Sequence, residues 1–147
     1  MSDSHRKIQL ERIGDGRYKA TNARGGVLPV GSGHDPDFTP VELLLAGIAG
    51  CSAIDVDLIA GKRAQPEAFR VEASGDKVRD GDGNHLTNIT VTFDLVYPEC
   101  EAGDAARAVL PRSLEQTRDR LCTVSRTVAL GTPVTFRLAR RACRHGG

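Results

Sequence analysis

The sequence predicts one α+β domain over residues 1–147, in which residues 1–6 and 140–147 are frayed tails. Two patterns carry this prediction. Short stretches in which apolar and polar residues alternate, as they do in strands, lie on both sides of a long apolar stretch at residues 39–61, which is typical of a buried helix. The sequence contains no glycine-rich nucleotide-binding turn and no internal repeat.

The residues before this helix predict a meander of three strands. Residues 7–13 and 17–23 form the first two strands, and residues 27–30 form a short third strand. Glycine-containing turns separate these stretches, so neighbouring strands are expected to pair antiparallel. A loop at residues 31–38 leads into the helix.

The long helix has a clear start and a clear end. Thr39 is a typical N-cap residue, Pro40 suits the first helical position, and Glu42 completes a capping box with Thr39. Gly61 is expected to end the helix. Two glycines, at positions 47 and 50, each cost about 1 kcal/mol relative to alanine inside a helix. We therefore expect another helix or a substrate to approach the backbone closely beside Cys51.

The residues after the long helix predict a hairpin, two helices and a last strand. Residues 69–78 and 86–97 alternate as strands do, and residues 79–84 form the turn between them. Residues 104–121 predict a helix that is kinked or broken before Pro111. The chain then predicts a short helix that ends at Gly131 and a final edge strand, at residues 122–130 and 132–139.

Composition and charge argue against several classes of protein. The formal net charge is +1, and aromatic residues make up 4% of the chain with no tryptophan, so we expect no nucleic-acid partner. We expect no membrane partner, because no uninterrupted apolar run reaches the roughly 20 residues that span a bilayer. The first residues lack a secretory signal, which predicts a cytoplasmic protein. The four cysteines, Cys51, Cys100, Cys122 and Cys143, are too widely spaced for a structural zinc site.

Two motifs resemble those of the OsmC/Ohr family, the osmotically inducible and organic-hydroperoxide-resistance proteins. The first is PVELLLAGIAGCSAIDV at residues 40–56, and the second is CTVS, which begins with Cys122, 71 residues after Cys51. The likeness extends to Phe136 and is greater to the less characterised OsmC-like branch than to the organic hydroperoxide reductases. It implies a two-layer fold in which an antiparallel sheet wraps around central helices. It also implies an intertwined homodimer with active sites at the subunit interface.

The resemblance implies a thiol peroxidase that acts on small organic hydroperoxides in oxidative or osmotic stress. Cys51 would be the peroxidatic cysteine and Cys122 the resolving cysteine, with an external thiol or dithiol as reductant and no metal or other cofactor. In the hydroperoxide reductases an arginine from the N-terminal strands orients the peroxide. Arg24 is our first candidate for this role and Arg17 the second, although either could be a solvated turn residue.

A glutamate near the helix start also orients the peroxide in those enzymes, and here Val41 occupies its position. Glu42 lies one residue later, which rotates its side chain by about 100° around the helix. Glu42 therefore remains a candidate catalytic residue, but the capping box with Thr39 also explains why a glutamate occupies this position. Asp55 is expected to have a structural role, and His34 could line the pocket mouth or be solvated.

This difference in glutamate position leaves two alternatives to peroxidase activity. In the first, the chain is an OsmC-like dimer that binds a small hydrophobic ligand in its interface pocket. In the second, Cys51 senses or reacts with electrophiles. Cys122 could likewise be a second buried cysteine that packs beside Cys51, since free cysteine is among the most buried residue types.

Overall fold

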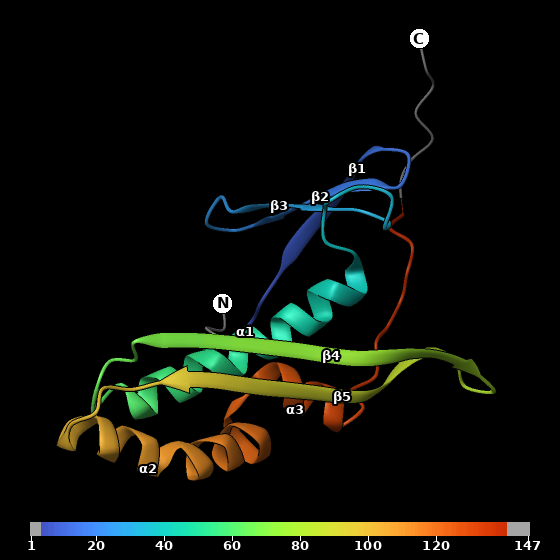
Figure 1. Ribbon diagram of the computed structural model, residues 1–147. Helices are drawn as coiled ribbons and strands as arrows, with labels where there is room; N and C mark the ends of the chain where they lie inside the picture. The colour runs from blue at the N-terminus through green and yellow to red at the C-terminus, as the bar shows by residue number, and fades with distance from the viewer. Residues whose placement is uncertain (1–3, 141–147) are drawn as a thin grey trace.

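The N-terminal meander in the computed structural model, which describes residues 4–140, is as predicted (Figure 1). Strands β1 (Ile8–Gly14), β2 (Arg17–Asn22) and β3 (Val27–Val30) form an antiparallel sheet in the order β1-β2-β3. Most of the two predicted tails lies outside the described residues. The sheet stands at one end of helix α1 (Figure 1).

Helix α1 (Pro40–Ala60) begins at the predicted capping box and is followed by Gly61 as its C-cap residue. Within the chain, however, only one face of α1 is buried, formed by every fourth residue: Ile48, Ser52, Val56 and Ala60. On the opposite side, Ile54 and Leu58 are 63% and 66% exposed. The apolar stretch at residues 39–61 predicted a buried helix, and in a single chain this prediction is wrong for all but one face of α1. By length and composition α1 could also cross a membrane, a test that the core helix of a soluble protein passes equally.

Strands β4 (Ala68–Asp80) and β5 (Gly83–Val96) form the predicted hairpin as a separate two-stranded antiparallel sheet. Phe69 and Phe93 pack edge to face on it, with ring centroids 6.4 Å apart. The hairpin lies along α1, and the C-terminal helices lie below it in the view of Figure 1. A small core joins these layers, consisting of Ala60, Tyr97 and Ala106.

The predicted helix at residues 104–121 is divided differently from our expectation. Helix α2 (Glu101–Gln116) starts earlier, with Cys100 as its N-cap, and continues through Pro111. The regular helix ends instead at a π-helical turn, η1 (Thr117–Leu121). Helix α3 (Thr123–Ala129) follows with Cys122 as its N-cap and agrees with the predicted short helix.

The predicted last strand at residues 132–139 is not a strand in this chain. Residues 132–140 form no strand pairing with any other described residue. The apolar side chains on one face of this segment are nearly free of contact, with Val134 74%, Phe136 90% and Leu138 96% exposed. The alternation that predicted a strand is present, but neither sheet of residues 4–140 pairs with this segment.

Candidate active site

The fold places the side chains of Cys51 and Cys122 together. Cys51 lies in the middle of α1 and is partly buried, whereas Cys122, between η1 and α3, is fully buried. Cys122 is among the groups that shift the pKa of Cys51, so the two thiols are neighbours. Both cysteines are free thiols. The site therefore contains two neighbouring reduced thiols, of which Cys51 is the more accessible.

Several groups around Cys51 act on its pKa in opposite directions. Burial raises the pKa most, and the hydrogen bond and charge of Cys122 raise it further. Hydrogen bonds from the backbone N–H groups of Val124 and Thr123 lower it, but the pKa remains raised. None of these groups is an arginine or a lysine. Because the thiolate is the nucleophilic form, a raised pKa makes Cys51 less reactive at neutral pH than an ordinary cysteine.

Cys122 is held by the start of α3. Its Sγ atom accepts a hydrogen bond from the backbone N–H of Ser125 at 3.4 Å. The same sulfur lies 4.0 Å from the carbonyl oxygen of Ile48 on α1. These contacts fix the Cys122 side chain on the side of α1 that carries Cys51.

The small residues around Cys51 explain how α3 can approach α1. A β-carbon added at Gly47 would lie 3.6 Å from Cγ1 of Val124 on α3, which confirms the expected close approach at this position. A β-carbon added at Gly50 would have no described atom within 4 Å apart from its own helix and neighbours. Gly47 thus lets α3 pack closely, while Gly50 opens onto a free face of α1.

A contact that we did not predict links α1 to the π-helical turn. The hydroxyl of Thr117 donates a hydrogen bond to Oδ2 of Asp55 over 2.7 Å. Asp55 lies one helical turn after Cys51, in agreement with its expected structural role. Periodicity treats Thr117 as one more position in a continuous helix, so no sequence signal identifies this contact.

The other residues predicted for the site lie elsewhere in the chain. Arg24 is exposed in the turn between β2 and β3, where its backbone N–H bonds to Asn22 Oδ1 at 3.1 Å. Arg17 lies at the start of β2, with its Nε atom 4.0 Å from a carboxylate oxygen of Asp35. His34 is exposed in the loop before α1. Neither arginine is among the groups that shift the pKa of Cys51.

Glu42 occupies the first turn of α1 and forms the capping box with Thr39. It is separated from Cys51 by nine helical positions, or about 13 Å along the helix axis. Glu42 is thus too far from Cys51 for direct contact within one chain. The capping role is confirmed, and a catalytic role in a larger assembly stays a prediction.

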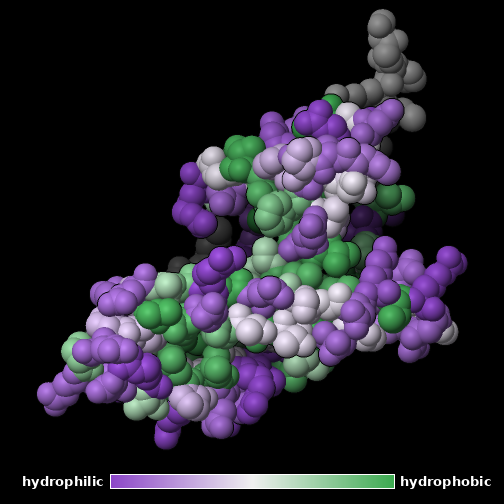
Figure 2. Space-filling view, viewed as in Figure 1, coloured by the Kyte–Doolittle hydropathy of each residue, from purple (hydrophilic) through white to green (hydrophobic). Residues whose placement is uncertain are grey.

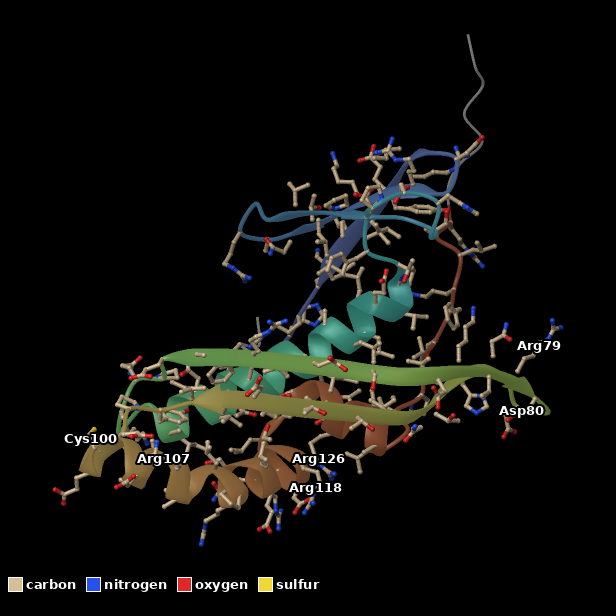
Figure 3. All side chains as sticks on the ribbon, in the orientation of Figure 1. Arg79, Asp80, Cys100, Arg107, Arg118 and Arg126 are labelled. Carbon is tan, nitrogen blue, oxygen red and sulfur yellow. The ribbon has the colours of Figure 1, made fainter. Side chains whose placement is uncertain are left out.

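Cys100 is separate from the cysteine pair. Figure 3 shows it at the start of α2, at the opposite end of that helix from Arg118 and Arg126. Its sulfur accepts the backbone N–H of Gly103 at 3.5 Å, so it caps α2. Cys143 lies outside the described residues. Between residues 4 and 140, no group of three or more histidine, cysteine or acidic side chains could hold a metal ion.

A largely apolar cavity of about 640 Å³ lies between β5, α1 and the C-terminal helices. Its lining includes Ile48, Ile89, Val91, Phe93, Leu114 and Val128. Neither Cys51 nor Cys122 lines it. Ile48 connects the two regions, because its side chain lines the cavity and its carbonyl oxygen faces the sulfur of Cys122.

Comparison with known proteins agrees with this architecture. Residues 33–137 match the family described as OsmC-like protein. An uncharacterized protein of Mycobacterium tuberculosis H37Rv is 32% identical over 133 residues, which cover 88% of this chain and 93% of the relative.

Two solved structures share the fold. The OsmC-like protein of Mycoplasma pneumoniae has a TM-score of 0.68 at 18% identity, with 87% of this chain and 89% of that chain covered. An organic hydroperoxide resistance protein OsmC of Legionella pneumophila has a TM-score of 0.59 at 14% identity, with 87% and 91% covered. The extent of the family match and the identity to the mycobacterial relative show that the chain belongs to the OsmC-like protein family.

Proposed function

We propose that this protein is a thiol-dependent peroxidase that reduces organic hydroperoxides, with Cys51 as the peroxidatic and Cys122 as the resolving cysteine. The observation that carries the proposal is the pair of neighbouring free thiols, one partly accessible and one fully buried. An accessible thiol can meet a peroxide, and a buried neighbour is protected from the peroxide yet lies beside the oxidised product. The structural neighbour from Legionella pneumophila, an organic hydroperoxide resistance protein, is consistent with this activity.

The proposed cycle has three steps. The Cys51 thiol gives up its proton, and its thiolate attacks the distal peroxide oxygen. The O–O bond breaks, Cys51 becomes a sulfenic acid, and the leaving alkoxide takes up a proton and departs as the neutral alcohol. The sulfur of Cys122 then attacks the sulfenic sulfur, a disulfide forms and water leaves. An external thiol or dithiol returns both cysteines to thiols by disulfide exchange, and is itself oxidised to a disulfide.

Efficient attack requires a lower pKa at Cys51 than a single chain provides. An opposite charge within about 4–6 Å would favour the thiolate. Arg24 and Arg17 are exposed on the β1–β3 sheet and are available to a second copy of the chain. We propose that the site is completed in a homodimer, in which one of these arginines reaches Cys51 from the partner subunit.

Two apolar surfaces support a homodimer. One is the open stripe on α1, which consists of Ala46, Gly50, Ile54 and Leu58. The other is the unpaired segment of residues 132–140, whose exposed Phe136 and Leu138 would be covered if the segment joined a sheet of the partner. Figure 2 shows apolar surface gathered between the β1–β3 sheet and the β4–β5 hairpin, with hydrophilic surface towards the ends.

The experiment that tests the peroxidase combines intact mass and a thiol count after one equivalent of an alkyl hydroperoxide. Wild type should lose two thiols per chain and form the Cys51–Cys122 disulfide. Cys51→Ser should consume no peroxide, because a serine oxygen is no useful nucleophile and cannot form a sulfenic acid. Cys122→Ser should complete one turnover and stop at the sulfenic acid of Cys51.

Cys100→Ser is the matched control, since Cys100 lies at the far end of α2. It should react like wild type. Peroxide consumption by Cys51→Ser at the wild-type rate would overturn the assignment of the nucleophile. No reaction in any variant would overturn the peroxidase itself.

The cavity favours a second candidate function, the binding of a small hydrophobic ligand. Its volume of about 640 Å³ lies within the range of about 300–1,000 Å³ that is usual for ligand sites. If this function holds, a fluorescent acyl probe should bind wild type and not Val91→Asp, because Val91 lines the cavity. Thr92→Asp, on the exposed face of the same strand, should bind normally. Absence of probe binding to wild type would exclude this candidate.

A further inference from the structure

The hydrogen bond between Asp55 and Thr117 connects the two helical segments that carry Cys51 and Cys122. Asp55 and Cys51 are four residues apart on α1, so they lie on the same side of that helix. Thr117 is only 4% exposed, and its hydroxyl lies 2.7 Å from the Asp55 carboxylate oxygen. The two partners are 62 residues apart in the sequence, so the bond is a tertiary contact.

Thr117 is also bonded to Cys122 through its backbone. Its carbonyl oxygen accepts the N–H of Cys122 at 2.9 Å, which closes the π-helical turn η1. Thr117 therefore contacts α1 with its side chain and Cys122 with its main chain. The start of η1 is anchored at Asp55. The end of η1 places Cys122 beside Cys51, which lies one helical turn before Asp55 on α1.

The π-helical geometry matters for where Cys122 points. In an α-helix the N–H of Cys122 would bond to the residue four positions earlier, and each position corresponds to a rotation of about 100°. In the π-helical turn the N–H of Cys122 bonds instead to Thr117, five positions earlier, so the turn contains one more residue. Such turns are rare and are frequently found at functional sites. A return to regular helix at this point would turn Cys122 away from α1.

We propose that Asp55 and Thr117 are positioning residues for the resolving step, holding the π-helical turn so that the sulfur of Cys122 meets Cys51. The inference rests on the proposed peroxidase cycle for its role in catalysis. Neither residue touches the peroxide. They act through the orientation of Cys122, so they should affect formation of the disulfide and not the first attack by Cys51.

The test measures the two steps separately in two variants, Thr117→Val and Asp55→Ala. Thr117→Val keeps the shape of the side chain and removes its hydroxyl. Both variants should react with one equivalent of alkyl hydroperoxide at a rate within about threefold of wild type. Disulfide formation should then slow by tenfold or more, and sulfenic acid at Cys51 should accumulate and be trapped by dimedone. Thr117→Ser and Asp55→Asn retain a donor and an acceptor and should form the disulfide at nearly the wild-type rate.

Ser113→Ala is the control for loss of a buried hydroxyl. Ser113 is fully buried on α2, and its hydroxyl donates to the carbonyl oxygen of Val109 at 2.6 Å within the same helix. This variant should leave both steps unchanged. A purely structural role of Thr117 would instead slow the two steps in parallel, and that outcome would overturn the proposal. Wild-type disulfide formation in Thr117→Val would overturn it as well.

A second measurement keeps the positioning role distinct from the peroxidase. The equilibrium between the dithiol and the disulfide can be titrated in a dithiothreitol redox buffer, without any peroxide. The effective concentration of Cys122 towards Cys51 should fall at least tenfold in Thr117→Val and recover in Thr117→Ser. If wild type fails to react with peroxide but this shift is found, the peroxidase is excluded and the positioning role stands. No shift in Thr117→Val contradicts the positioning role.

Discussion

Thr39 and Glu42 exchange two hydrogen bonds at the start of α1. The N–H of Thr39 donates to Oε1 of Glu42 at 2.9 Å, and the N–H of Glu42 donates to Oγ1 of Thr39 at 3.3 Å. Two backbone donors that a helix start leaves unpaired are satisfied by this exchange. The bond with Thr39 also holds the pKa of Glu42 below its ordinary value.

If Glu42 only caps the helix, Glu42→Gln should retain peroxide turnover and change stability little at neutral pH, because the glutamine oxygen can still accept from Thr39. The lowered pKa of Glu42 means that its charged form stabilises the fold above pH about 4.3 and that this contribution is lost as the pH falls. Glu42→Gln should remove that part of the acid sensitivity. Urea unfolding at pH 7 and at pH 3.5 measures both effects.

Thr39→Ala is the matched control for the cap, and it should cost about 1 kcal/mol of unfolding free energy. A hundredfold fall in turnover for Glu42→Gln at an unchanged melting temperature would contradict the capping explanation. It would show that the carboxylate acts on the peroxide.

The reactivity of Cys51 should depend on pH and on assembly. Burial raises its pKa in the single chain, so less thiolate is present at pH 7 than in a free cysteine. In a monomeric variant, alkylation of Cys51 by iodoacetamide should therefore rise with pH and reach its midpoint above the ordinary value of about 8.5. In the dimer an arginine of the partner subunit should move the midpoint lower. Mass spectrometry of the Cys51 peptide follows the rate, and a midpoint below 8.5 in the monomer would refute the argument.

Wild type should sediment as a homodimer. Its interface should bury more surface area than the roughly 1,200–2,000 Å² that standard complexes bury. The double variant Phe136→Asp with Leu138→Asp should dissociate it, because two buried charges would face the partner. Thr135→Asp lies on the other face of the same extended segment and serves as the control. A stable wild-type monomer at micromolar concentration would disprove the assembly.

Gly103→Ala should destabilise the start of α2 severely. A β-carbon at Gly103 would overlap the carbonyl oxygen of Pro98, a backbone atom that cannot rotate away. Arg107 holds that segment by donating to the carbonyl oxygens of Tyr97 and Pro98 at 2.9 and 3.2 Å. The expected loss is on the order of 3 kcal/mol of unfolding free energy in urea titrations.

Gly81→Ala is the control for this prediction, because a β-carbon there meets no described atom within 4 Å. It should change the unfolding free energy by less than about 0.5 kcal/mol. Equal effects of the two substitutions would mean that the contact at Pro98 is relieved by movement of the chain.

Much of the local structure follows from the sequence alone. The capping box, the proline at the first helical position and the apolar run determine where α1 begins, because these signals act between residues a few positions apart. Alternation of apolar residues likewise determines β1, β2, β4 and β5. The cysteine pair was expected from the family resemblance and not from the spacing of the residues, since the 70 residues between Cys51 and Cys122 carry no geometric information.

Only the tertiary structure decided how these elements meet. The bond between Asp55 and Thr117 and the π-helical turn that it anchors depend on contacts across 62 residues, which local patterns do not encode. The same reason explains the failure at residues 132–139, where alternation favours an extended chain but a strand also needs a neighbouring edge. Sequence determines which segments can form helices and strands, and the tertiary contacts determine which of their faces are covered and where the sulfur of Cys122 points.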